Sequence, residues 1–206
     1  MERDNRKVVT VPLSIFSEAD QKYILQWGFN KVFLSESSFK IDAKRKEVKD
    51  KDDSYSSTIQ AKKVENMGYE LVLENRSTAK LENIEIEYCI YYEQERATRG
   101  KQLCEQGVRY EKIEIPYLIP KSKKEIMTEA VKIYKAELDA DWIYTSGVKN
   151  VQKGKVHGIW VQVHMKLDSG EKISRNFSLP DSLNNNKAWK TSSTYVGMNS
   201  SRKKNK

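Results

Sequence analysis

The chain has 206 residues, of which 38% are hydrophobic and 32% are charged, and its formal net charge is +8. This length is enough to bury a real core, either in one domain with attachments or in two small domains. The mean hydropathy of −0.75 indicates a heavily solvated protein. No apolar run approaches the roughly 18 residues that a membrane-spanning helix needs, so no membrane span is expected.

The positive charge gathers at the C-terminus. Four of the eight excess charges lie in the last five residues, namely Arg202, Lys203, Lys204 and Lys206. The rest of the chain therefore carries only +4, and charges of both signs are mixed in it, as in 44–53. This pattern is typical of a solvated loop, so nucleic-acid binding by the body is not expected. Residues 190–206 are predicted to form a disordered basic tail.

A helix is expected close to the N-terminus. Ser17 stands at an N-cap position, Asp20 completes a weak capping box, and Gly28 is placed to end the helix. A strand-like run at 8–11 precedes the helix and ends at Pro12. The helix carries one apolar stripe, formed by Ala19, Tyr23, Ile24 and Trp27. We expect this stripe to pack against the domain that follows it.

Alternating apolar residues predict β-strands over most of the remaining chain. A first strand begins at Phe39 and Ile41, and a long exposed connection at 44–57 follows it. Further strands are expected at 69–73, 84–92, 108–115, 126–133, 156–167 and 171–179. Turns are expected at 75–77, 95–102, 116–120 and 168–170. The segment 126–133 also allows a short helix, and 134–141 is open between helix and loop.

Two of these strands show the clearest alternation. In 84–92 the apolar row is Ile84, Ile86, Tyr88, Ile90 and Tyr92, and the opposite row is Glu85, Glu87, Cys89, Tyr91 and Glu93. In 156–167 one apolar row runs from His157 to Leu167. Short antiparallel strands joined by polar turns predict a mainly β fold. We expect an immunoglobulin-like antiparallel β-sandwich with a short N-terminal strand-helix attachment.

Two stretches of sequence resemble known families. The pattern VTVPLS followed by SEADQKYI resembles the C-terminal end of the Sla-homology domain, an SH3-like β-barrel common in the Planctomycetes and Verrucomicrobia group. The runs GYELVLENRSTAKLENIEIEYCIYYEQE, DADWIYTSG and VHGIWVQVHMKLDSGEKISRNFSLPDSL are similar to an immunoglobulin-like module that follows such domains in large exported bacterial proteins.

This resemblance implies three parts. Residues 1–30 are the remnant of a Sla-homology domain, 31–189 form the immunoglobulin-like β-sandwich, and 190–206 are the tail. It also implies a periplasmic or extracellular location and a chain that is a piece of a longer protein. The surface with which a Sla-homology domain binds peptides would lie mostly on strands that this sequence lacks.

The cysteines and histidines offer few sites. Cys89 and Cys104 lie near the two sides of one expected hairpin, so a disulfide between them is a hypothesis for an exported protein. It would be worth about 3 kcal/mol for a loop of roughly 15 residues. His157 and His164, seven residues apart on one strand, are expected to face opposite sides. They therefore do not share a metal ion, and no metal or cofactor site is expected.

Aromatic residues are the best candidates for binding. Tyr91 and Trp160 lie opposite the apolar rows, where exposed rings contact a protein or stack on a sugar. The alternative is that the N-terminal helix or the C-terminal segment covers them. Neither a GxSxG nor a GxxxxGK[ST] pattern is present, so no enzyme is expected.

These observations predict a non-catalytic interaction or structural module of a cell-envelope or exported bacterial protein. Two alternatives remain open from the sequence. One is a carbohydrate-binding module that uses exposed aromatic residues. The other is binding of an anionic surface or a nucleic acid through the basic tail.

Overall fold

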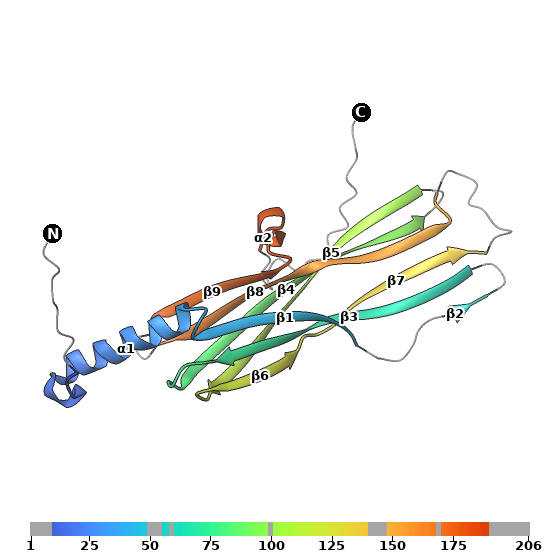
Figure 1. Ribbon diagram of the computed structural model, residues 1–206. Coiled ribbons are helices and arrows are strands. Elements are labelled where there is room, and N and C mark those ends of the chain that lie inside the picture. The colour runs from blue at the N-terminus through green and yellow to red at the C-terminus, as the bar shows by residue number, and fades with distance from the viewer. Residues whose placement is uncertain are drawn as a thin grey trace, which may run out of the picture.

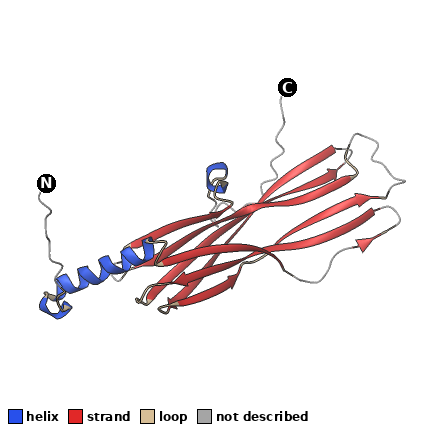
Figure 2. Cartoon of the chain, in the orientation of Figure 1, coloured by secondary structure: helices blue, strands red, loops and turns tan. Residues whose placement is uncertain are grey.

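The computed structural model describes residues 10–48, 55–57, 60–98, 101–139, 148–167 and 170–189. Figure 1 shows an elongated body of long strands with one helix at its end. Strands predominate throughout this body (Figure 2). Their pairings are antiparallel, which confirms the expected mainly β fold. The immunoglobulin-like topology stays a prediction.

The helical elements are η1 (Leu13–Ile15), α1 (Glu18–Leu34) and α2 (Leu183–Asn186). The strands are β1 (Phe39–Glu47), β2 (Tyr55–Ser56), β3 (Gln60–Asn75), β4 (Leu81–Thr98), β5 (Lys101–Leu118), β6 (Ser122–Met127), β7 (Val131–Leu138), β8 (Val151–Lys166) and β9 (Lys172–Leu179).

The strands follow one hydrogen-bonded path, β1-β3-β7-β8-β4-β5, with β2 and β6 paired to β3 and β9 paired to β8. β3 changes partner along its length, because its second half pairs with β1 and β6 and its first half pairs with β7. The strands thus form two groups, one with β1, β2, β3, β6 and β7 and the other with β4, β5, β8 and β9. The link between the two groups is short, because β7 and β8 pair over only three residues each. The group β4, β5, β8 and β9 carries the features described below.

One hydrophobic core is shared by both groups of strands. Most of its fully buried residues come from β3, β4 and β8, and they include Leu71, Leu73, Ile84, Ile86, Ile90, Ile159, Val161 and Val163. Tyr88 is also fully buried, and its Oη accepts a hydrogen bond of 2.9 Å from the backbone N–H of Glu129. The polar end of this tyrosine is therefore satisfied inside the core.

Helix α1 begins as expected but ends later. Ser17 is the N-cap, and its Oγ accepts a hydrogen bond of 3.2 Å from the backbone N–H of Asp20. Gly28 does not end the helix, which continues to Leu34 and crosses the expected domain boundary at residue 30. The reason lies in the residues after the glycine: Phe33 is fully buried and stacks on Phe39 at 5.2 Å between ring centroids.

The expected apolar stripe of α1 is not packed on the body. Tyr23 is 71% exposed and Trp27 is 54% exposed, and Ala19 and Ile24 are exposed as well. Figure 1 shows the helix extending away from the strands, with only its C-terminal end close to them. The prediction that the stripe packs against the following domain is therefore wrong. The strand expected at 8–11 lies mostly outside the described residues, and Thr10 and Val11 form no strand.

Several strands are longer than their apolar patterns indicate. β1 continues into the expected connection as far as Glu47, whereas 49–54 lie outside the described residues. β4 and β5 extend their hairpin through most of the expected turn at 95–102. β5 also passes through Pro116, which is tolerated because β5 lies at the edge of the sheet path. The extensions of β1 and of the closing end of the hairpin are polar, so backbone pairing rather than burial maintains them, whereas the extension beyond Pro116 ends at the buried Leu118.

The strand expected at 126–133 is divided between β6 and β7, with Thr128 buried between them. β7 then continues to Leu138, so most of the ambiguous segment 134–141 is strand. In the expected turn at 168–170, Gly170 has a φ of +85°, a conformation that favours glycine. Asp168 and Ser169 lie outside the described residues.

A β-bulge in β8 changes the faces expected for its first residues. Tyr91 pairs with Gly158, but Tyr92 pairs with Val156, so His157 is an extra residue. Val156 is consequently buried in the core, and His157 Nε2 lies 3.1 Å from Glu93 Oε2. The bulge overturns the expected alternation: His157 leaves the core row and lies on the same side of the sheet as His164.

Candidate functional site

The side of β5, β4, β8 and β9 that is turned away from the core is called the outer face here. It has an apolar part, the aromatic cluster, and a charged part, the carboxylate–histidine cluster. The aromatic cluster comprises Cys89, Tyr91, Val108, Tyr110, Trp160, Leu183 and Trp189. The carboxylate–histidine cluster comprises Glu85, Glu87 and His164.

The C-terminal segment 180–189 covers the aromatic cluster. The indole of Trp189 meets Trp160 edge-on, with ring centroids 5.2 Å apart, and meets Tyr110 in the same way at 6.4 Å. Tyr91 Oη donates a hydrogen bond of 2.8 Å to the carbonyl oxygen of Ala188. Leu183 is buried against the same cluster. This segment therefore holds the outer face with both apolar contacts and a hydrogen bond.

The position of this segment shows whether the two aromatic residues predicted to bind a partner are exposed. Tyr91 is 3% exposed, and Trp160 is half-buried with its Nε1 atom enclosed. The proposal that they present exposed rings to a protein or a sugar is therefore wrong for Tyr91 and unsupported for Trp160. Of the two expected covers it is the C-terminal segment, rather than the N-terminal helix, that occupies this face.

The expected disulfide is also absent. Cys89 pairs with Tyr110 and Cys104 pairs with Glu95, so the two cysteines lie six positions apart along the hairpin, and both are free. Six strand residues span about 20 Å, whereas the Cα atoms of a disulfide lie within about 7 Å. The cysteines do lie on opposite strands, as expected, but the centre of the hairpin lies about three residues beyond the position midway between them, which shifts them apart by six positions.

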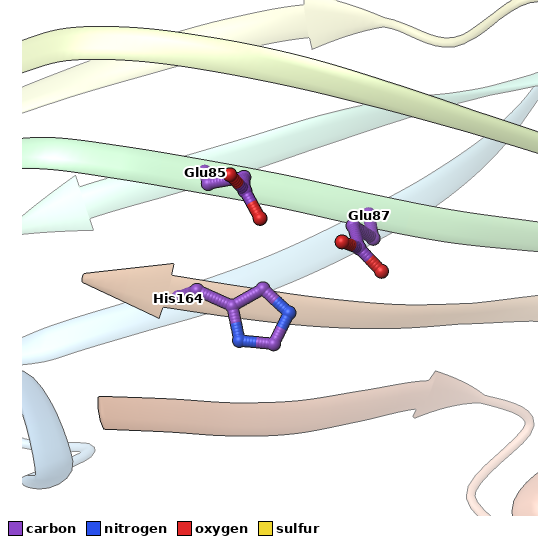
Figure 3. Close-up of side chains that lie close together, drawn as sticks. All are labelled: Glu85, Glu87 and His164. Atoms are coloured by element: carbon purple, nitrogen blue, oxygen red, sulfur yellow. The ribbon is translucent and has the colours of Figure 1, made fainter. Parts of the chain in front are cut away.

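The carboxylate–histidine cluster is shown in Figure 3. One potential ligand atom from each of Glu85, Glu87 and His164 lies within 4.8 Å of the other two. The pairing of β4 with β8 creates this proximity, because Glu85 stands opposite His164 and Glu87 stands two residues along the same face. Two carboxylates and one imidazole from neighbouring strands therefore converge.

His164 is held by its neighbours on β9. The residue is 8% exposed, and its Nδ1 lies 2.6 Å from Ser174 Oγ. Burial and the nearby Lys172 ammonium lower the pKa of the imidazole, so the neutral ring is favoured. When Nδ1–H donates to the serine hydroxyl, the lone pair of the ring is on Nε2. In Figure 3 the second ring nitrogen lies on the side of Glu87.

The two glutamates have different surroundings. Glu85 accepts from Lys112 Nζ at 2.6 Å and from Lys172 Nζ at 2.7 Å, which together lower the pKa of its carboxyl to about 2. Glu87 neighbours Tyr110, and burial together with this carboxylate raises the pKa of the tyrosine hydroxyl. The two ammonium groups therefore keep the Glu85 carboxylate ionised near neutral pH. Tyr110 also links the two parts of the outer face, because its ring belongs to the aromatic cluster.

The chemistry of this cluster is that of a ligand set. It contains two carboxylates and a neutral imidazole, which are metal ligands. The cluster was not predicted from the sequence, because the two histidines were compared with each other and not with the residues of the neighbouring strand. The alternating glutamates of 84–92 were the available signal, but the β4–β8 register was needed to use it.

Two hollows lie outside the outer face clusters. A groove of about 140 Å³ between α1 and one end of the strands is lined in part by Leu25, Phe29, Met165 and Leu167. A second hollow at the start of β8 contains Lys149, Lys153 and Lys155 together with Glu93 and Glu95. Its charges are partly neutralised, since Lys149 Nζ lies 3.3 Å from Glu95 Oε1.

Known proteins assign neither a family nor an activity to this chain. No protein-family model matches it, and no curated protein matches it. The structural-genomics target SoR45 is similar at 13% identity and a TM-score of 0.29, over 70% of this chain and 88% of that one. The sporulation control protein Spo0M from Bacillus subtilis is similar at 10% identity and a TM-score of 0.24, over 68% of this chain and 48% of Spo0M.

No described helix is both long and apolar enough to span a membrane. The resemblance to a Sla-homology domain stays a prediction.

Proposed function

We propose that this chain is a non-catalytic interaction module of a cell-envelope or exported bacterial protein, and that the exposed segment 15–27, which includes the larger part of α1, binds a protein partner. The observation that supports this proposal is the exposure of large apolar side chains at this end of the molecule. They are Ile15, Phe16, Tyr23, Ile24, Leu25 and Trp27. Large apolar groups that gather in solvent mark interaction surfaces more often than single exposed residues do.

The chemistry of the helix favours a protein groove as its partner. Tyrosine and tryptophan contribute most to binding when an apolar pocket encloses them. The charges on α1 balance, because Glu18 and Asp20 oppose Lys22 and Lys31. A balanced helix has no electrostatic preference for an anionic surface. Insertion of the exposed helix into an apolar groove of the partner is the recognition mode that fits these side chains.

The attachment of α1 supports the same proposal. Phe33 anchors the last turn of the helix in the core, and the Arg175 guanidinium donates to the backbone carbonyl oxygens of Phe33 and Phe39. The helix therefore projects from a fixed base. A binding element that is already ordered loses less conformational entropy when it binds.

Site-specific photo-cross-linking in the bacterium that produces the protein tests this proposal. A photoreactive residue at Tyr23 should yield one dominant cross-linked protein, whereas the same residue at Tyr117, which is exposed on β5, should not. The captured protein is then purified and titrated with this chain. Replacing both Tyr23 and Trp27 by alanine should weaken binding by at least about 30-fold, as expected for a central aromatic pair.

The control is Tyr117→Ala, which should leave the dissociation constant unchanged. Equal binding by the double variant and the unmodified chain would overturn the proposal. So would cross-linking of Tyr23 to a second copy of this chain, with a sedimenting dimer that the double variant loses.

A further inference from the structure

We infer that Glu85, Glu87 and His164 form a binding site for one divalent transition-metal ion of the zinc class. The inference is independent of α1 and of its partner. It starts from geometry: the three ligand atoms are within 4.8 Å of one another. Atoms bound to one zinc ion at about 2.0 to 2.2 Å are separated from each other by roughly 3 to 4 Å. Small side-chain rotations therefore bring the three groups to coordination distance.

The donor set selects the class of ion. Carboxylates alone suit magnesium or calcium, whereas an imidazole nitrogen favours zinc, cobalt, nickel or copper. Two carboxylates and one imidazole make three protein ligands, which leaves a further position for water. The site is formed by two adjacent strands of one sheet, so its backbone is fixed before an ion binds.

The environment of His164 is the second observation. The side chain is more than nine-tenths buried and points towards the carboxylates (Figure 3). Its Nδ1 is engaged by Ser174 Oγ, and its second ring nitrogen lies on the side of Glu87 (Figure 3). A histidine that ligates a metal commonly uses its other nitrogen to hold an outer partner in this way. Ser174 is thus the orienting group of the site.

Two lysines compete with the ion. Lys112 and Lys172 each bind one oxygen of Glu85, and Lys112 also lies 3.3 Å from Glu114. An ion that uses Glu85 must displace at least one of these ammonium groups and then tolerate its charge nearby. Removing Lys172 should therefore tighten binding of the ion. A site whose carboxylates serve only the lysines would show no such gain.

The chain contains its own control. His157 lies 3.1 Å from Glu93 on the same face, but within the described part of the chain it belongs to no group of three potential ligands. Each histidine thus has one close carboxylate on β4, and only His164 has a second one. Replacing His157 removes an imidazole of similar surroundings without changing the proposed ligands.

Calorimetric titration of the whole chain with zinc chloride at pH 7.5 tests the inference, with cobalt absorption spectra as a second readout. We expect one ion per chain. His164→Ala should weaken binding by about 100-fold or more and Glu87→Gln by about 10 to 100-fold, because each removes a ligand. His157→Ala should change the affinity by less than about 3-fold, and Lys172→Met should increase it.

Circular dichroism checks that each variant is folded. Glu87→Gln is the decisive variant if His164→Ala unfolds, because Glu87 is only half-buried and the change keeps its shape. Absence of zinc binding at millimolar concentration would overturn the inference. Equal weakening by His157→Ala and Glu87→Gln would overturn it as well.

Discussion

Helix α1 precedes the strands in the chain and the segment 180–189 follows them, and both carry a tryptophan, but only the tryptophan of the second segment is packed on the strands. Trp189 contacts Trp160 at 5.2 Å and Tyr110 at 6.4 Å. Trp27 is 54% exposed, and its contact is with the ammonium of its own helix neighbour Lys31, at 4.6 Å from the ring centroid.

The difference comes from what the strands offer to each segment. The outer face presents Cys89 and Tyr91 in place of charged residues, so an apolar segment that follows β9 finds a matching surface. α1 reaches the strands only with its last turns, where Phe33 enters the core. An apolar stripe thus indicates that another surface packs against the helix, but it does not identify that surface.

The largest expected effect separates the two ends of α1. Phe33→Ala should lower the free energy of unfolding by about 3 to 5 kcal/mol, because it removes a buried ring that stacks on Phe39. Trp27→Ala should change it by less than about 0.5 kcal/mol, as is usual for an exposed side chain. Urea unfolding of the two variants measures both values. Similar losses for both would mean that the whole helix is packed.

The next largest effect concerns the C-terminal segment. Trp189→Ala should destabilise the protein by about 2 kcal/mol, which is less than a full core tryptophan because the ring is half-buried. Trp189→Phe keeps an aromatic ring against Trp160 and should lose less than half of that. Thermal unfolding monitored by circular dichroism compares the two variants. If Trp189→Ala and Trp27→Ala had equal effects, the proposed difference between the segments would not hold.

Alkaline pH should loosen the C-terminal segment and leave α1 unchanged. Burial raises the pKa of Tyr91, and the Cys89 thiol raises it further, so folding favours the neutral hydroxyl that donates to Ala188. This contribution, about 1 kcal/mol for the hydrogen bond, is complete below the ordinary tyrosine pKa of about 10. It is lost as the pH rises above that value.

Proteolysis of the segment 180–189 at increasing pH measures this effect. Cleavage should accelerate above pH 10 in the unmodified chain. In Tyr91→Phe the bond is missing at every pH, so cleavage should be faster at neutral pH and should depend less on pH. A pH profile of Tyr91→Phe identical to that of the unmodified chain would exclude Tyr91 as the titrating group.

The smallest expected effect is a difference in the iodide quenching of tryptophan fluorescence. Iodide should quench Trp27 strongly and Trp160 weakly, because one indole is exposed and the other lies under Trp189. Trp27→Phe should therefore remove most of the quenchable emission from the described tryptophans, whereas Trp160→Phe should remove little of it. Strong quenching that disappears with Trp160→Phe would show that the segment does not cover the outer face.

The sequence allowed prediction of the strands that alternate in burial. Ile84, Ile86 and Ile90 face the core as expected, because a half-buried strand requires a two-residue period. The N-cap at Ser17 was also predictable, since it depends only on the residues that follow. The end of α1 was not, because the burial of Phe33 outweighs the tendency of Gly28 to end a helix.

The candidate site could not be predicted from any single strand, because it depends on how neighbouring strands pair. The bulge at His157 changes which residues of β8 share a face, and no alternation in the sequence marks it. The register that places Glu85 opposite His164 is likewise a property of two segments together. The chemical types of the ligands were visible in the sequence, but their convergence was not.

The hairpin of β4 and β5 also gives the molecule a fixed length. It keeps one register from its first strand residue, Leu81, to Thr98, opposite Lys101, with a gap in the pairing only at Asn83, and this corresponds to roughly 55 Å. Figure 1 shows α1 at one end of the body and the closing end of this hairpin at the other. A partner bound by α1 as proposed would therefore be held at a set distance from that tip, with the body as a spacer between them. Cys104, exposed close to the tip, provides an attachment point for a dye with which this distance can be measured.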